Sequence, residues 1–121
     1  MEDIIHHQSS QFDEELGRLR SNVLKMGGLV ENQVAQATEA YRYCDVSLAN
    51  SIVARDKDVN ALEKEIDDDY AHVIARRQPT ASDLRLVFGI IKIVTDLERI
   101  GDEAKKFAKG IRRVCESGQA P

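Results

Sequence analysis

The amino-acid sequence predicts an all-α fold, an antiparallel three-helix bundle that occupies residues 1–121 as one domain. The composition, with 42% hydrophobic and 31% charged residues but only two prolines, is typical of a globular helical protein. Apolar residues recur at helical spacing through three long segments, and turn-forming residues separate these segments. A chain of 121 residues has room for one modest core. We expect a helical core over about residues 8–115 and a tail at residues 116–121.

The first predicted helix runs from Ser10 to about Cys44, where apolar or small residues alternate four and three apart in a heptad seam. Ser10 and Asp13 have capping-box spacing, and the helix would extend for about 35 residues. Gly27 and Gly28 lie in its middle and cost about 1 kcal/mol each relative to alanine. We expect the helix to continue through them, with either a close helix approach or a bend at this point.

The second and third predicted helices have clear N-terminal signals. Asp45 is the expected N-cap of the second helix, and Thr80 with Asp83 forms the expected capping box of the third. The apolar pattern of the second helix loses phase near residues 55–57, which indicates a kink between two helical pieces. The third helix follows Pro79 and continues to about Cys115.

Charge, hydropathy and cysteine content restrict the class of function. A net charge of −4 argues against a nucleic-acid partner, because a phosphate backbone selects clustered Lys and Arg. No apolar run reaches the roughly 20 residues that span a bilayer, so we expect a soluble cytoplasmic protein without membrane insertion. Cys44 and Cys115 could pair in principle, but we expect them to stay reduced in that compartment. The sequence shows neither a nucleophile paired with a base nor a glycine-rich phosphate loop, so we expect no enzymatic activity.

The third predicted helix has two apolar faces. One contains Leu84 and Ile91 and turns acidic where its continuation brings Glu98 and Asp102. The other stays apolar along the helix, and we expect it to be buried throughout. This second face consists of Leu86, Ile90, Ile93, Leu97, Ile100, Ala104, Ala108 and Ile111.

The second and third helices each carry a Glu-x-x-x-Asp pair, Glu63 with Asp67 and Glu98 with Asp102. In antiparallel helices, residues equally distant from the connection lie level, which places Glu63 opposite Glu98. Four neighbouring carboxylates repel one another unless a cation neutralises them. Oxygen ligands favour Mg, Ca, Mn or Fe, so the pairs predict a metal site. The alternative is a solvated charged helix face.

Five further residues complete the candidate set. Asp56 and Asn60 lie behind the acidic pair of the second helix and are weaker ligand candidates. Arg99 is expected to orient or pair with the acids rather than to bind metal. Arg77 and Arg85 flank the connection between the second and third helices, where they either clamp the loop or contact a partner.

Three segments carry a family resemblance. They are RQPTASDLR at residues 77–85, LERIGD at residues 97–102 and MGGLVE at residues 26–31. Together with the Glu63-x-x-x-Asp67 pair, they resemble the PhoU family of phosphate-signalling proteins over essentially the whole chain.

The resemblance implies a three-helix PhoU repeat and a cytoplasmic negative regulator of the phosphate-starvation response, with no reaction of its own. Family members are accessories of the phosphate ABC transporter that link its ATPase to a sensor histidine kinase, and they commonly dimerise. Their acidic motifs bind metal ions or iron clusters in some members. These motifs match Glu63 with Asp67 and Glu98 with Asp102 here.

The chain departs from the family pattern in one respect. A typical member has two tandem three-helix repeats, whereas one repeat is visible here, as in a truncated chain or a single-repeat homologue. We therefore expect self-association through the third helix or the exposed part of the first. Two other classes stay open on the residues alone, a carboxylate-bridged metalloenzyme and a structural helical assembly domain.

Overall fold

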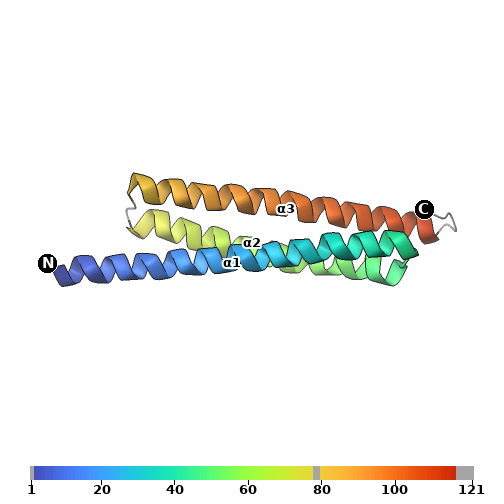
Figure 1. The fold of residues 1–121 in the computed structure, drawn as a ribbon, viewed down its shortest axis with the longest axis horizontal. Coiled ribbons are helices and arrows are strands. Elements are labelled where there is room, and N and C mark those ends of the chain that lie inside the picture. The colour runs from blue at the N-terminus through green and yellow to red at the C-terminus, as the bar shows by residue number, and fades with distance from the viewer. Residues whose placement is uncertain (1, 78–79, 117–121) are drawn as a thin grey trace.

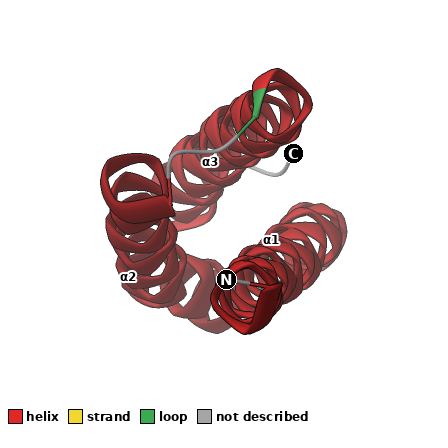
Figure 2. Ribbon diagram, turned by 90° about the vertical axis from the view of Figure 1, so that its left-hand side faces the viewer, coloured by secondary structure: helices red, strands yellow, loops and turns green. Residues whose placement is uncertain are grey.

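The computed structural model describes residues 2–77 and 80–116, and the side chains of residues 11–76 and 80–116. It contains three helices, α1 (Glu2–Tyr43), α2 (Val46–Arg77) and α3 (Ala81–Glu116). Figure 1 shows α2 running antiparallel to α1 and α3, and the end-on view of Figure 2 places the helices at three corners. Each helix packs against both others. The predicted antiparallel three-helix bundle is therefore confirmed for the described residues, while residues 117–121 of the predicted tail lie outside them.

Helix α1 begins at Glu2, earlier than the predicted start at Ser10. The N-terminal part of α1 extends past the end of the bundle at which α2 and α3 meet (Figure 1). Tertiary packing therefore does not set the start of this helix.

Gly27 and Gly28 lie within α1, which continues through both as predicted. Of the two alternatives expected here, a close approach of another helix is wrong, because a Cβ at either position would meet no packed neighbour within 4 Å. These glycines leave open space at the surface of α1.

Helix α2 runs unbroken through residues 55–57, so the predicted division into two helical pieces is wrong. The apolar pattern loses phase there because Asp56 occupies a core position and is only 6% exposed. The buried stripe of α2 therefore contains a polar residue at a position where an apolar one was expected, and the helix continues past it.

Both predicted helix caps are present. The backbone N–H of Leu48 donates to Asp45 Oδ1 at 3.0 Å, and Cys44 has a left-handed φ of 51° that turns the chain from α1 into α2. At the start of α3, the N–H of Asp83 donates to Thr80 Oγ1 at 3.2 Å, and the N–H of Thr80 donates to Asp83 Oδ2 at 3.1 Å. This reciprocal pair is a capping box, as the sequence predicted.

Two apolar clusters fill the bundle. The larger one is built around long side chains that are almost fully buried, among them Leu19, Met26 and Ile66. The smaller one lies at the end where α1 turns into α2, and small side chains dominate it. Its buried members are Ala37, Ala40, Ala49, Ile52, Ala108 and Ile111. Among the described residues, none of the helices has a stretch both long and apolar enough to cross a bilayer.

One predicted apolar face of α3 is only partly buried. Ile90, Ala104 and Ile111 are in the core, whereas Ile93 and Ile100 are 50% and 46% exposed. In a three-helix bundle, about two positions in every seven on each helix face the core. The row that contains Ile93 and Ile100 is adjacent to those positions and therefore lies outside the core. The expectation of continuous burial is therefore wrong for that outer row.

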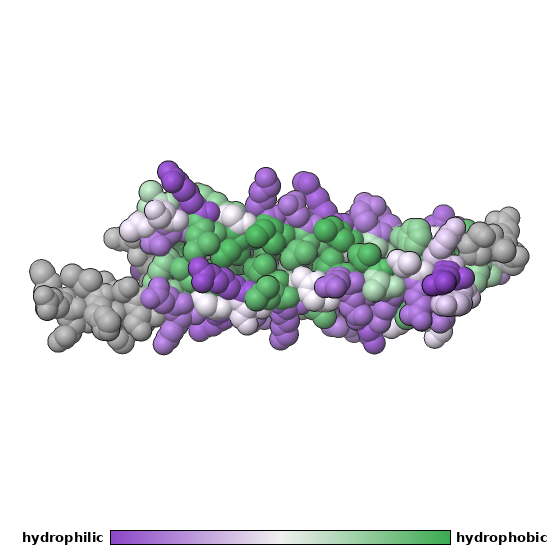
Figure 3. All heavy atoms as spheres, viewed as in Figure 1, coloured by the Kyte–Doolittle hydropathy of each residue, from purple (hydrophilic) through white to green (hydrophobic). Residues whose placement is uncertain are grey.

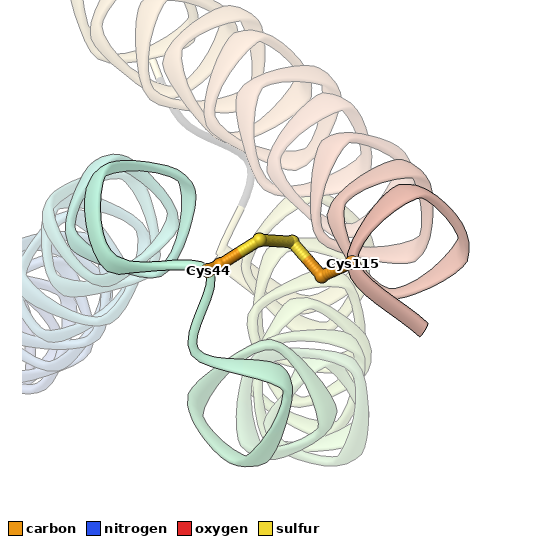
Figure 4. Close-up of a disulfide and its surroundings, with 2 residues drawn as sticks. All are labelled: Cys44 and Cys115. Atoms are coloured by element: carbon orange, nitrogen blue, oxygen red, sulfur yellow. A yellow bond between two sulfur atoms is a disulfide. The ribbon is translucent and has the colours of Figure 1, made fainter. Parts of the chain in front are cut away.

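Cys44 and Cys115 form a disulfide, which corrects the expectation that they stay reduced (Figure 4). Helices α1 and α3 run in the same direction and end side by side. This arrangement brings the two Cα atoms to 5.7 Å, within the range for a disulfide, although 71 positions separate them in sequence. The bond ties the ends of α1 and α3 together.

Candidate metal centre

The register between α2 and α3 is set by two contacts. Lys105 Nζ lies 3.5 Å from Asp56 Oδ2, and the Arg112 guanidinium donates to Asn50 Oδ1 at 3.1 Å. In each pair the two residues are almost equally distant from the α2–α3 connection. The predicted antiparallel register is therefore confirmed by contacts that are independent of the acidic pairs.

The register brings Glu63 of α2 and Glu98 of α3 together, and both are half-buried. Burial raises the pKa of the Glu63 carboxyl above its ordinary 4.5, and the charges of Glu98, Asp67 and Asp56 raise it further, in that order. Asp67 is exposed on the next turn of α2. Glu63 thus lies among like charges that a bound cation would relieve.

Asp102, the fourth predicted ligand, is exposed and pairs with Lys106 Nζ at 3.2 Å. This hydrogen bond raises the pKa of Lys106. Within the described residues, no three Asp, Glu, His or Cys side chains lie close enough to form a ligand group. The acids form a facing pair with two flanking carboxylates, not a closed cage. Mg²⁺ keeps several waters and is held by one or two carboxylates, so a hydrated divalent ion fits this donor set.

A buried polar layer lies beside the acidic pair. Asp56 accepts hydrogen bonds from Gln33 Nε2 of α1 and from Asn60 Nδ2 of α2, each at 3.4 Å. Lys105 of α3 completes its surroundings at 3.5 Å. All three helices therefore contribute to the layer, and the Asp56 carboxylate already has a cationic partner within the protein.

Gly101 allows α3 to pass close to this layer. A Cβ at this position would lie 3.0 Å from Gln33 Oε1 and 3.8 Å from Asp56 Oδ1. Gln33 Oε1 is buried and has no hydrogen-bond partner among the described residues. The glycine within the LERIGD segment thus leaves room for the Gln33 amide, between two acidic positions of the candidate site.

We expect alanine to have opposite effects at Gly101 and Gly89 of α3. A Cβ at Gly89 meets open space, so Gly89→Ala should raise the free energy of unfolding by about 0.5–1 kcal/mol through helix propensity. At Gly101 the new methyl group must displace Gln33, and overpacking should leave a net loss of about 1 kcal/mol. Urea denaturation of both variants is the measurement. An equal gain at the two sites would show that Gln33 moves aside freely.

Two of the three predicted arginines lie at the surface, and the side chain of the third is not among those that the structure describes. Arg85 and Arg99 are exposed, while the side chain of Arg77 and the neighbouring loop residues are outside the described set.

His72, the one histidine among the described side chains, lies with Nε2 3.5 Å from Glu15 Oε1 of α1. This contact turns the histidine toward α1 and away from the α2–α3 acids.

Sequence reasoning missed three residues of the polar layer, Gln33, Lys105 and Gly101. Gln33 was visible as the polar member of an otherwise apolar heptad seam. Lys105 could have been found from the register, since it lies level with Asp56. The tight space at Gly101 had no signal in the sequence, because it depends on how closely α1 and α3 approach.

The raised pKa of Glu63 predicts a specific dependence of stability on pH. Its pKa is higher in the folded state than in the unfolded chain, so the folded state binds the proton more tightly. Stability should therefore fall as pH rises from about 4.5 through the folded pKa. Glu63→Gln should be more stable than the parent at pH 7, and the difference should vanish below pH about 4. Denaturation at both pH values tests this, with the exposed Glu65→Gln as control. A gain that persists in acid would exclude the electrostatic cause.

Comparison with known proteins identifies the family. A family model described as "PhoU domain" matches residues 23–111. The chain is 48% identical over 120 residues to a Pseudomonas putida "Phosphate-specific transport system accessory protein PhoU homolog", covering 99% of this chain and 47% of the relative. It is also 48% identical over 103 residues to "Phosphate-specific transport system accessory protein PhoU" of Escherichia coli K12, covering 85% of this chain and 43% of the relative.

A solved structure agrees with this result. The crystal structure of PhoU from Pseudomonas aeruginosa superposes with a TM-score of 0.86 at 48% identity, covering 91% of this chain and 53% of that one. The chain thus spans about half the length of the relatives it matches. Fold, motifs and sequence identity agree, and the chain belongs to the PhoU family.

Proposed function

We propose that this chain acts in the cytoplasm as a non-enzymatic accessory of phosphate uptake and a negative regulator of the phosphate-starvation response. The observation that carries the proposal is 48% identity along 99% of the chain to a relative whose name is that of a phosphate-transport accessory protein. In this role the bundle is an adaptor. It contacts the ATPase of a phosphate ABC transporter and a sensor histidine kinase, and restrains the kinase when phosphate is plentiful.

The test is complementation in a bacterium that lacks its own PhoU and carries a reporter of the phosphate-starvation response. Expression of this chain should restore repression in high phosphate, and it should retain the kinase and the transporter ATPase in a pull-down. A chain of this length that accumulates normally but neither represses the reporter nor retains either protein would contradict the adaptor role.

We also propose that Glu63 and Glu98 bind a hydrated divalent cation, with Asp67 and Asp102 completing its surroundings. The support is the chemistry of the donors and the raised pKa of Glu63, which reflects carboxylates that repel one another. The polar layer around Asp56 would hold α2 and α3 in register beneath the ion. Binding here would lower the repulsion between the two helices.

Mn²⁺ serves as the probe, because it prefers oxygen ligands and can be detected directly by electron paramagnetic resonance. The parent should bind about one ion per chain and gain thermal stability, whereas Glu63→Gln with Glu98→Gln should lose both effects. A matched control replaces Asp58 and Glu65, exposed acids of α2, by Asn and Gln. Equal Mn²⁺ binding by parent and site variant would leave the acids as a solvated face.

A further inference from the structure

The disulfide lies at one end of an apolar groove between α1 and α3. The groove has a volume of about 770 Å³, with Val34 and Tyr41 in the wall that α1 forms, and Phe107 and Cys115 in the wall that α3 forms. Figure 3 shows the apolar band between the two helices. Because Cys44 directly follows α1 and Cys115 lies in the last turn of α3, the bond ties the two walls together (Figure 4). We call this feature the α1/α3 groove.

Noncovalent packing at this end of the bundle is thin. Four of the six buried members of the cluster here are alanines, and the other two are Ile52 and Ile111. Small side chains bury little apolar area, and stabilisation grows with the area buried. Beyond Ile111, α3 continues to Glu116, where the contact of Arg112 with Asn50 of α2 is exposed. The last turn of α3 therefore depends on the disulfide more than the rest of the helix does.

The surroundings of the bond favour reaction with small thiols. Both cysteines are only partly buried. Residues 105–113 carry five cations and no acid just before Cys115, and one acid, Glu116, follows it. Reactive cysteines lie in partly exposed electropositive settings, because cations stabilise the thiolate. The same charges attract an anionic thiol such as glutathione.

We propose that Cys44 and Cys115 form a reversible thiol–disulfide exchange site that opens and closes this end of the α1/α3 groove. The thiolate of a small thiol attacks one sulfur of the bond, forms a mixed disulfide and releases the other cysteine as a thiolate. A second small thiol attacks the mixed disulfide. The products are two cysteine thiols and one oxidised dimer of the small thiol, so two electrons pass to the protein. The reverse reaction, with the oxidised dimer as oxidant, restores the bond.

The two states differ at the end of α3. In the oxidised state the bond holds α3 beside α1, and the Tyr41 and Phe107 rings are 5.7 Å apart across the groove. In the reduced state the last turns of α3 open locally, while the larger apolar cluster keeps the rest of the bundle folded. Disulfides in the cytosol are usually transient or redox-sensing, which matches this behaviour in the cytoplasm. The proposed function enters here only through that location.

The first test is exchange of the native chain with mixtures of reduced and oxidised glutathione, without denaturant. Alkylation followed by mass spectrometry should show an oxidised fraction that follows the glutathione ratio in both directions. Arg113→Glu should slow reduction by about threefold or more, because it reverses an exposed charge beside Cys115. Arg85→Glu, at the other end of α3, is the matched control. A bond that stays closed until urea is added would overturn the exchange site.

The second test locates the structural change by hydrogen exchange. On reduction, the backbone amides of residues 108–116 should exchange about tenfold faster or more, and those around Leu19 and Ile66 should keep their rates. The double variant Cys44→Ser with Cys115→Ser should match the reduced parent with or without reductant. Diiodomethane joins the two reduced cysteines through a methylene group that reductant cannot cleave, and this form should exchange as slowly as the oxidised parent. Uniform acceleration along the chain would contradict local opening.

The third test reports on the groove itself. The sequence contains no tryptophan, so Phe107→Trp places a single fluorophore in the groove wall. Its emission should shift to longer wavelength on reduction, whereas that of Phe88→Trp, exposed in the other half of α3, should stay constant. An unchanged Phe107→Trp emission, or an equal shift in both variants, would overturn the opening of the groove. None of these measurements involves phosphate, the kinase or the transporter ATPase, so failure of the proposed function is a separate result.

Discussion

Replacing Cys44 and Cys115 by serine is expected to lower the free energy of unfolding by about 4 kcal/mol. The disulfide joins residues 71 positions apart, and closing a loop of that size removes about this much conformational free energy from the unfolded chain. The loss is a large share of the 5–15 kcal/mol that stabilises a typical small protein. Urea denaturation of the parent and the double serine variant is the measurement.

Reductant provides the control for this prediction. Dithiothreitol should destabilise the parent to the level of the serine variant and leave that variant unchanged. Alkylation of the unfolded parent should label no thiol before reduction and two thiols afterwards. Two labelled thiols before reduction, or a loss below about 1 kcal/mol, would show that the cross-link does not stabilise the bundle.

Lys105→Met is expected to be the most destabilising replacement of a charged residue, at about 3 kcal/mol. It leaves the Asp56 carboxylate, which is 6% exposed, without its cation. Breaking one partner of a buried pair typically costs 3–5 kcal/mol, and the partial exposure of Lys105 places this site at the lower end. The measurement is urea denaturation at pH 7.

The neighbouring residue Lys106 supplies the matched control. Its ion pairs with Asp102 and Glu103 are exposed, so Lys106→Met should leave the free energy of unfolding almost unchanged. Adding Asp56→Leu to Lys105→Met should recover part of the lost stability, because the uncompensated charge is gone. Similar losses from Lys105→Met and Lys106→Met would mean that Asp56 keeps its charge solvated by water.

Local chemistry explains the parts of the fold that could be predicted. The caps at Asp45 and Thr80 depend on side chains within three residues of the helix start, so the sequence contains the whole interaction. The approach of Glu63 and Glu98 followed from helix periodicity and a short connection, which set the register of two antiparallel helices. The metal role of these acids stays a prediction, since it depends on an ion.

Long-range packing explains what could not be predicted. Cys44 and Cys115 meet because α1 and α3 end side by side. The two residues are 71 positions apart, and no local sequence pattern indicates that they are close in space. Asp56 looked like a break in α2 because its partners, Gln33 and Lys105, come from the other two helices. The tight space at Gly101 likewise depends on a side chain of α1.

The sequence by itself determined three helices, their caps, their antiparallel order and the level at which the acids meet, because these follow from 3.6-residue periodicity and short connections. Only the tertiary structure decided which of two apolar rows on α3 enters the core, which polar groups are buried together and whether the two cysteines join. A row such as Ile93 and Ile100 has the same hydropathy whether it is buried or exposed. Its burial depends on how far each helix rotates about its own axis, and the packing of all three helices sets that angle.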